Sequence, residues 1–131
     1  MTLLDDAVRD LYGDLEIDGR VLDMGESNAG RFDVPPDELV AGDPRDFEDA
    51  SFDAVLLSNG ELPDFDEVAR VLRPGGYFVL TFAGSDDDAA RVRIVRSRFA
   101  ATDAFGPAES DLRTSLTGTG DRLWAVWARR R

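Results

Sequence analysis

A strand–helix–strand pattern in the middle of the chain constrains the fold more than any other feature. Residues 52–58 (FDAVLLS) and 77–82 (YFVLTF) are short, nearly continuous apolar runs, typical of buried strands. Between them, residues 63–72 (PDFDEVARVL) place apolar side chains on one face of a helix, and residues 73–76 (RPGG) end it. A helix that joins two buried strands predicts a parallel sheet, because the crossover returns the chain in the same direction.

The rest of the chain continues this alternation of strands and helices. The other predicted elements are a helix over residues 2–13, strands over residues 20–24 and 38–41, a helix over residues 85–99, and a hairpin of residues 112–117 and 122–128 around a turn at 118–121. We therefore predict a single domain over residues 1–131, of class α/β, with a doubly wound, mostly parallel sheet and a C-terminal antiparallel hairpin. In such sheets, ligands bind at the carboxyl ends of the strands.

The composition excludes several kinds of chemistry. The chain has no Cys, which excludes disulfides, thiolate metal sites and a Cys nucleophile. It has no His either, so a Ser-His-Asp triad, a His-ligated zinc and a His general base are all excluded. The sequence therefore predicts a site that works without these residues and without a metal.

The charge indicates an environment and excludes some partners. All 15 basic residues are Arg, against 27 acidic residues, which gives a formal net charge of -12. Such a negative field argues against nucleic acid as a partner. A hydrophobic content of 43% is too high for an acidic disordered segment, and molar salt shortens the Debye length to about 3 Å. We therefore expect a halophilic source. No apolar run approaches the roughly 18 residues of a membrane helix and no secretory signal opens the chain, so we expect a cytoplasmic protein.

Three segments of the chain together resemble a known enzyme family. VLDMGESNAG, AGDPRDFEDASFDAVLLS and DEVARVLRPGGYFVLTF are similar to the motifs of class I S-adenosylmethionine-dependent methyltransferases. The resemblance covers about residues 20–83, and its most specific part is the spacing of SFDAVLLS and VARVLRPGGYFVLTF. It implies a Rossmann-like sheet of methyltransferase type, with S-adenosylmethionine as cofactor and a methyl transferase activity.

The first motif supplies candidate cofactor-binding residues. Asp23 ends a predicted strand, and its carboxylate can balance the ammonium of an amino-acid group; Gly25 lets the backbone pass close to a ligand. The alternative is that Asp23 caps a turn that Gly25 permits. The family pattern has three glycines here, whereas Ser27 and Ala29 stand at the second and third positions. We include Ser27 among the cofactor-binding candidates, although its side chain departs from the pattern.

A shortened segment separates this motif from the next strand. In the family, a second strand ends in an acid that holds the ribose hydroxyls, and a third brings a polar residue near the adenine. Only one of these strands fits between Asp23 and Phe52. Asp43 matches the ribose acid by its spacing from Asp23, but its local sequence resembles the adenine-side segment, which we favour. The alternative is a turn acid before Pro44.

The loop after residues 52–58 supplies candidates for the reaction itself. The resemblance places Ser58 beside the cofactor, with Asn59 and Glu61 facing the methyl donor and acceptor. Asn59 is predicted to orient the acceptor and Glu61 to take its proton. The alternative is that these residues only begin a helix, with Asn59 and Gly60 as a turn.

Two functions follow from these observations. The first is a methyltransferase that uses S-adenosylmethionine and acts on an unknown acceptor. The second is a methyltransferase-fold module without catalysis, which serves as a binding or regulatory unit in a homo-oligomer or with a protein partner. The degraded glycine motif and the missing segment favour the second function, whereas the family resemblance favours the first.

Overall fold

The computed structural model describes residues 4–25, 31–32, 34–58, 61–83, 88–114 and 122–131. The elements, in chain order, are α1 (Leu4–Asp14), β1 (Arg20–Gly25), β2 (Glu38–Ala41), the 3₁₀ helix η2 (Pro44–Asp46), β3 (Phe52–Ser58), α2 (Phe65–Val71), β4 (Leu72–Ala83), α3 (Asp88–Ala101), β5 (Glu109–Thr114) and β6 (Arg122–Arg129). None of the helices in these ranges is long and apolar enough to cross a membrane.

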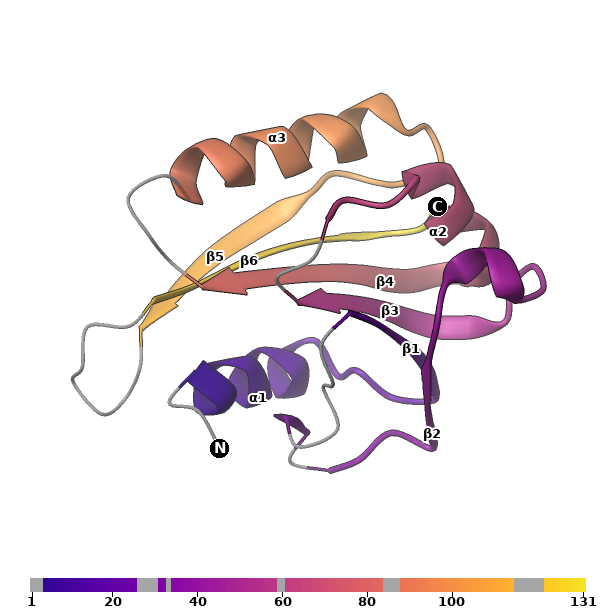
Figure 1. Cartoon of the computed structure of the whole chain (residues 1–131), viewed down its shortest axis with the longest axis horizontal. Coiled ribbons are helices and arrows are strands. Elements are labelled where there is room, and N and C mark those ends of the chain that lie inside the picture. Colours follow the sequence, from indigo (N-terminus) through magenta and orange to yellow (C-terminus); the bar gives the residue numbers. More distant parts are fainter. Residues whose placement is uncertain (1–3, 26–30, 33, 59–60, 84–87, 115–121) are drawn as a thin grey trace.

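The strands form one mixed, six-stranded sheet. Their order is β2-β1-β3-β4-β6-β5, in which β2, β1, β3 and β4 run parallel (Figure 1). Strand β6 runs antiparallel to β4 and pairs with β5 to form the C-terminal hairpin. Helix α1 covers one face of the sheet, and α2 and α3 lie on the other. This arrangement confirms the predicted α/β fold with its parallel sheet and antiparallel hairpin.

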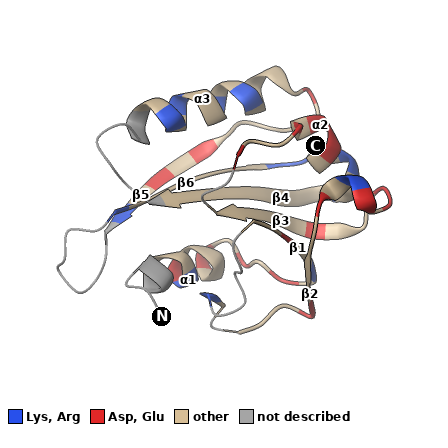
Figure 2. Ribbon diagram, in the orientation of Figure 1, with Lys and Arg blue, Asp and Glu red and all other residues tan. Residues whose placement is uncertain are grey.

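The face that carries α2 and α3 holds an aromatic core. Phe65, Phe78, Phe99 and Phe105 are all buried, and their ring centroids lie 4.9–6.3 Å apart, mostly in edge-to-face geometry. Rings in this geometry stabilise each other beyond the area that they bury. These rings tie α2, β4, α3 and the segment before β5 into one unit, whose central strands carry little charge (Figure 2).

The face that carries α1 has a smaller core with a different composition. Ala7, Val8 and Leu11 of α1 pack on β1, β3 and β4, as the helical spacing of these residues predicts. The same face becomes polar towards the carboxyl ends of the strands, where Asp23, Ser58 and Thr81 follow the apolar positions. The functional site is therefore sought on this face.

Two strands begin three or more residues before their predicted starts. Strand β4 begins at Leu72 and not at residue 77, because Leu72 pairs with Phe52 and a register shift between Phe52 and Ala54 accommodates the extra residues. Gly75 adopts a φ of 85°, which explains the glycine there. Strand β5 begins at Glu109, three residues early, since it pairs with β6 along its whole length. Residues 84–87 and 115–121, with the predicted helix start and hairpin turn, lie outside the described residues.

The acid of the FDAVLLS segment has a structural role at the amino ends of the strands. The Asp53 carboxylate accepts a hydrogen bond from the Arg20 backbone N–H at 2.9 Å and forms an ion pair with Arg73 at 2.9 Å. A Cβ on Gly19 would lie 2.2 Å from the Asp53 carboxylate, so glycine is needed there. Asp53 thus joins β1, β3 and β4 at the end opposite the candidate site.

Candidate functional site

Three polar side chains are buried at the carboxyl ends of neighbouring parallel strands. Asp23 on β1, Ser58 on β3 and Thr81 on β4 are 4%, 1% and 2% exposed. Gly25 is in register with Ser58, and Ser58 with Thr81, so these positions form a row across the sheet. Burial of polar groups is costly unless they are satisfied, so such a row in an apolar sheet marks a functional edge.

The polar row is joined by hydrogen bonds to two further residues. The Ser58 and Thr81 hydroxyl oxygens lie 2.9 Å apart, and the Arg31 guanidinium donates to Ser58 Oγ at 3.1 Å. The Tyr12 hydroxyl also shares a hydrogen bond with the Ser58 side chain. Burial raises the pKa of Tyr12 well above its usual value, the charge of Arg31 opposes this rise, and the charge of Asp23 adds to it. The hydroxyl of Tyr12 therefore stays neutral within electrostatic reach of both charges.

The backbone at Gly25 requires a glycine. Its φ is 101°, a conformation that side-chain-bearing residues rarely adopt. A Cβ at this position would lie 3.4 Å from Leu57 Cδ1 and from the Ser58 carbonyl oxygen. The backbone at Gly25 therefore passes close to the end of β3.

Two residues that follow β1 lie on the polar row itself. Arg31 contacts Ser58, and Phe32 is buried with its ring centroid 4.8 Å from that of Tyr12. Side chains of the protein thus fill this part of the crevice, between α1 and the ends of β1 and β3. A ligand that reaches Ser58 along this side has to displace the Arg31 side chain.

A cavity of about 320 Å³ lies on the other side of β1 from Arg31. It is lined by Met24, Asp43, Pro44, Arg45, Pro63, Asp64 and Glu67. Met24 faces this cavity from the α2 side of the sheet, whereas its neighbours Asp23 and Gly25 face the other side, so the cavity and the polar row meet across the end of β1. The cavity lies between the end of β2 and the start of α2, and its size falls at the lower end of the range for small-molecule sites.

Asp43 is held by its neighbour at the edge of this cavity. Its carboxylate accepts hydrogen bonds from Arg45 Nε at 3.1 Å, Arg45 Nη2 at 2.9 Å and the Arg45 backbone N–H at 2.9 Å. These bonds lower the pKa of Asp43 to about 2. Strand β2 pairs directly with β1, with Ala41 opposite Asp23, so Asp43 lies one strand away from the polar row. The backbone N–H of Gly42 also donates to the Asp23 carbonyl at 3.2 Å.

The structure brings some of the predicted site residues together. Asp23, Gly25 and Ser58 share the polar row, and Asp43 borders the neighbouring cavity. Glu61 is exposed in the segment between β3 and α2. Ser27 and Asn59 lie outside the described residues.

Three residues that belong to the polar row or form hydrogen bonds with it were not predicted from the sequence. Tyr12 lies within the predicted helix over residues 2–13 at the spacing of its apolar residues, and only its position near the helix end distinguishes it. Thr81 carried a usable signal, because it is the one polar residue of YFVLTF. Arg31 carried none, since it follows a loop whose path the sequence does not define.

The fold is that of a Rossmann-like α/β domain, with a buried polar row at the carboxyl edge of its parallel strands. A family of methyltransferase domains matches residues 3–80, which is more than half of the chain. The chain therefore belongs to the class I S-adenosylmethionine-dependent methyltransferase domains, a family that uses S-adenosylmethionine as methyl donor.

Individual relatives agree with this assignment. The chain is 56% identical over 54 residues to a fatty-acid O-methyltransferase of Mycolicibacterium smegmatis (strain ATCC 700084 / mc(2)155), a match that covers 35% of this chain and 20% of the relative. The matched segment is thus only about a fifth of that relative's length.

Similar solved structures support the fold alone. A putative sarcosine dimethylglycine methyltransferase from Galdieria sulphuraria aligns with a TM-score of 0.57 and 16% identity, over 95% of this chain and 84% of the other. The M. jannaschii protein TYW2 in complex with AdoMet aligns with a TM-score of 0.57 and 12% identity, over 100% and 78%. A probable spermidine synthase from Corynebacterium glutamicum gives 0.55 and 13%, over 97% of this chain and 63% of the other.

Proposed function

We propose that this domain binds S-adenosylmethionine along the carboxyl edge of β2, β1 and β3 and transfers its methyl group to an acceptor. The observation that carries the proposal is the buried row of Asp23, Ser58 and Thr81 beside the close backbone turn at Gly25. An amino-acid group fits this row, because Asp23 supplies a buried carboxylate for an ammonium and Gly25 leaves room for the ligand. The remaining nucleoside fits the cavity beside Met24 and Asp43.

Each residue has a distinct task in this proposal. The cofactor supplies an electrophilic methyl group on a sulfonium, whose C–S bond breaks with its electron pair left on sulfur as the acceptor attacks. Asp23 holds the ammonium, and Ser58 and Thr81 fix the edge by their mutual hydrogen bond. Asp43 and Ser27 border the cofactor, with Asp43 on the adenine side. Asn59 orients the acceptor and Glu61, which is exposed, takes its proton to water.

A second function is favoured by a specific contact. The Arg31 side chain already donates to Ser58, and Phe32 is stacked on Tyr12, so the crevice is filled from within the protein. This arrangement suits a domain that keeps the methyltransferase fold as a binding or regulatory module, in a homo-oligomer or with a protein partner. In the first function the cofactor displaces the Arg31 side chain from Ser58, whereas in the second the Arg31 side chain stays there.

Calorimetric titration of the whole chain with S-adenosylmethionine and S-adenosylhomocysteine tests both functions. The acidic composition leads us to propose a halophilic, cytoplasmic protein, so molar KCl is the condition of choice. We expect binding that Asp23→Asn weakens at least tenfold. Asp103→Asn, at an exposed acid that lines neither this cavity nor the polar row, serves as the control. No binding at millimolar ligand by the wild type, together with binding after Arg31→Ala, assigns the module function. No binding by either variant contradicts the cofactor site.

A further inference from the structure

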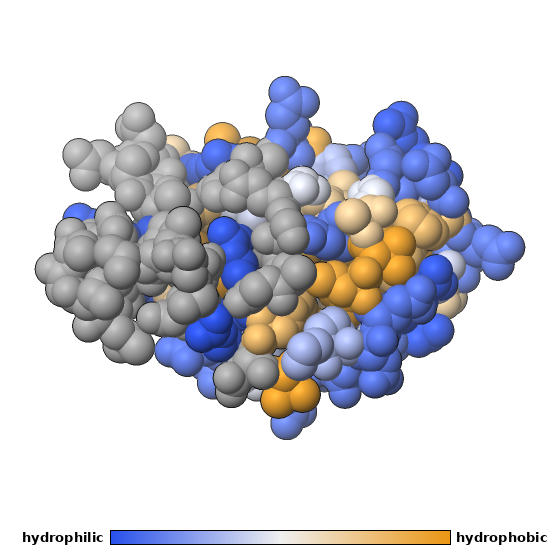
Figure 3. Space-filling view, turned by 60° about the horizontal axis from the view of Figure 1, so that its bottom comes forward, coloured by the Kyte–Doolittle hydropathy of each residue, from blue (hydrophilic) through white to orange (hydrophobic). Residues whose placement is uncertain are grey.

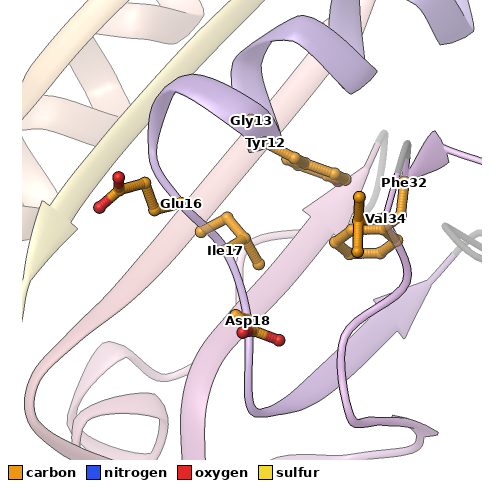
Figure 4. Close-up of a pocket in the computed structure, with 7 residues that line it drawn as sticks. All are labelled: Tyr12, Gly13, Glu16, Ile17, Asp18, Phe32 and Val34. Carbon is orange, nitrogen blue, oxygen red and sulfur yellow. The ribbon is translucent and has the colours of Figure 1, made fainter.

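A second cavity of about 330 Å³ adjoins the polar row on the α1 side. It is formed by the last turn of α1, the link to β1 and the segment after β1 (Figure 4). Its lining residues are Tyr12, Gly13, Glu16, Ile17, Asp18, Phe32 and Val34. The predicted sites and the family motifs do not include this cavity.

The wall of the cavity is apolar. Tyr12 and Phe32 form a tilted ring pair, with Ile17 beside it in the α1-side core. Val34 also lines the cavity and is 79% exposed, so it adds apolar surface that a ligand can contact. In the view that brings the α1 and β2 side of the molecule forward, apolar surface is visible among hydrophilic side chains (Figure 3).

The charged side chains among the described lining residues are acidic. They are Glu16 and Asp18, whereas the charge of Arg31 reaches the wall only at Tyr12, from the polar row. Figure 4 shows that the Asp18 carboxylate points to the side on which Phe32 and Val34 lie, whereas the Glu16 side chain extends away from them. An apolar wall with a carboxylate at its edge is complementary to an apolar ligand that carries a positive charge.

The cavity shares one residue with the proposed cofactor site. Tyr12 contributes its ring to the cavity wall and its hydroxyl to the Ser58 side chain. Tyr12 therefore links the two sites, together with Phe32, whose ring packs against it and also lines the cavity.

From these observations we propose that the cavity binds a small apolar amine in its ammonium form, with the apolar body against Tyr12 and Phe32 and the charge at Asp18. This binding does not depend on the function proposed above. Carboxylates of the same size are disfavoured, because Asp18 repels them.

Three probes of matched size test the proposal by NMR or calorimetric titration of the whole chain. We expect 2-phenylethylamine to bind about five times more tightly than 2-phenylethanol at low salt, and phenylacetate more weakly than either. Asp18→Asn should bring the amine to the affinity of the alcohol. Glu16→Gln is the matched control, since its side chain points away, and should leave the preference within twofold.

If a variant does not fold, the titrations of the wild type still test the proposal. Equal affinities for the amine and the carboxylate, or no binding of any probe at millimolar concentration, would overturn it. A parallel titration with S-adenosylhomocysteine separates this proposal from the previous one. Amine selectivity without cofactor binding contradicts only the methyltransferase function, whereas cofactor binding without amine selectivity contradicts only this cavity's role.

Discussion

The unit β3–α2–β4 and the region of β1 and β2 differ in strand length and in how completely their side chains are buried. In the first, the strands are seven and twelve residues long and are buried at their centres, and Phe65 of α2 packs against Phe78 of β4. In the second, β2 has four residues, none of them fully buried, and it forms the edge of the sheet. The first region supplies stability, and the second leaves open the space in which a ligand is proposed to bind.

This difference has a physical origin in the length of chain available. The family pattern has two strands and a helix between the first motif and the next strand, whereas β2 is the only strand between β1 and β3 in the described ranges, with the short 3₁₀ helix η2 after it. With less chain, fewer apolar side chains cover β1 and β2, and the cavities of about 320 and 330 Å³ lie on the two sides of this region. The thinner apolar cover of β1 and β2 and the cavities beside these strands thus have the same cause.

The largest expected effect is a loss of stability on substitution in the better packed region. Phe78→Ala should lower the free energy of unfolding by about 3–5 kcal/mol, because it removes a ring from the centre of the aromatic cluster. Val40→Ala in β2 should lower it by about 1 kcal/mol or less, since Val40 is only half-buried. Urea unfolding followed by tryptophan fluorescence measures both, and equal losses would contradict the contrast between the regions.

The next effect concerns the backbone at the end of β1. Gly25→Ala should cost about 1–3 kcal/mol, because Ala is strained at a φ of 101°. Gly13→Ala in α1 is the control: a Cβ there meets no atom within 4 Å, and Ala should stabilise the helix by about 0.5–1 kcal/mol. In thermal unfolding, the midpoint temperature should fall for Gly25→Ala and rise for Gly13→Ala. An unchanged midpoint for Gly25→Ala would show that the backbone at this position is not constrained.

A smaller effect depends on alkaline pH. Burial raises the pKa of Tyr12 in the folded protein, so above pH about 10 the unfolded chain loses this proton while the folded protein keeps it. Stability should therefore fall as the pH rises past the ordinary Tyr pKa. Tyr12→Phe should remove part of this fall in urea midpoints measured across that range. An unchanged pH dependence would mean that the hydroxyl is not buried on Ser58.

The smallest effect belongs to the exposed pair at η2. Bonds from Arg45 hold the pKa of Asp43 at about 2, so the stability contributed by this pair is present above the ordinary Asp pKa of about 3.9 and is lost as the pH falls towards 2. Carboxyl ¹³C NMR should show a midpoint near 2 that rises towards the ordinary value in Arg45→Gln. A midpoint that does not respond to Arg45→Gln would exclude this pair in solution.

The sequence predicted the well packed region more completely than the open one. The apolar runs of β3 and β4, the amphipathic α2 and even the short β2 were readable, because burial leaves a periodic pattern in the residues. The early start of β4 at Leu72 was not readable, since Pro74 and Gly75 are ordinary signals of a loop.

The site was predictable only where a motif marks it. Asp23, Gly25 and Ser58 followed from the family resemblance, and the strand register brings them together. The contact of Arg31 with Ser58 and the stacking of Phe32 on Tyr12 depend on the path of the chain after β1, which no local pattern defines. These contacts distinguish the two proposed functions, and they are visible only in the three-dimensional structure.

The most direct measurement is an NMR titration of the ¹⁵N-labelled whole chain with S-adenosylhomocysteine. If the carboxyl edge of β1 and β3 is the cofactor site, amide shifts should change at Gly25, Ser58 and Thr81 and at the cavity residue Arg45, while those of β5 stay in place. The Arg31 side-chain signal should move with them as it leaves Ser58. Shift changes confined to other parts of the sheet, or none at millimolar ligand in both wild type and Arg31→Ala, would contradict this assignment.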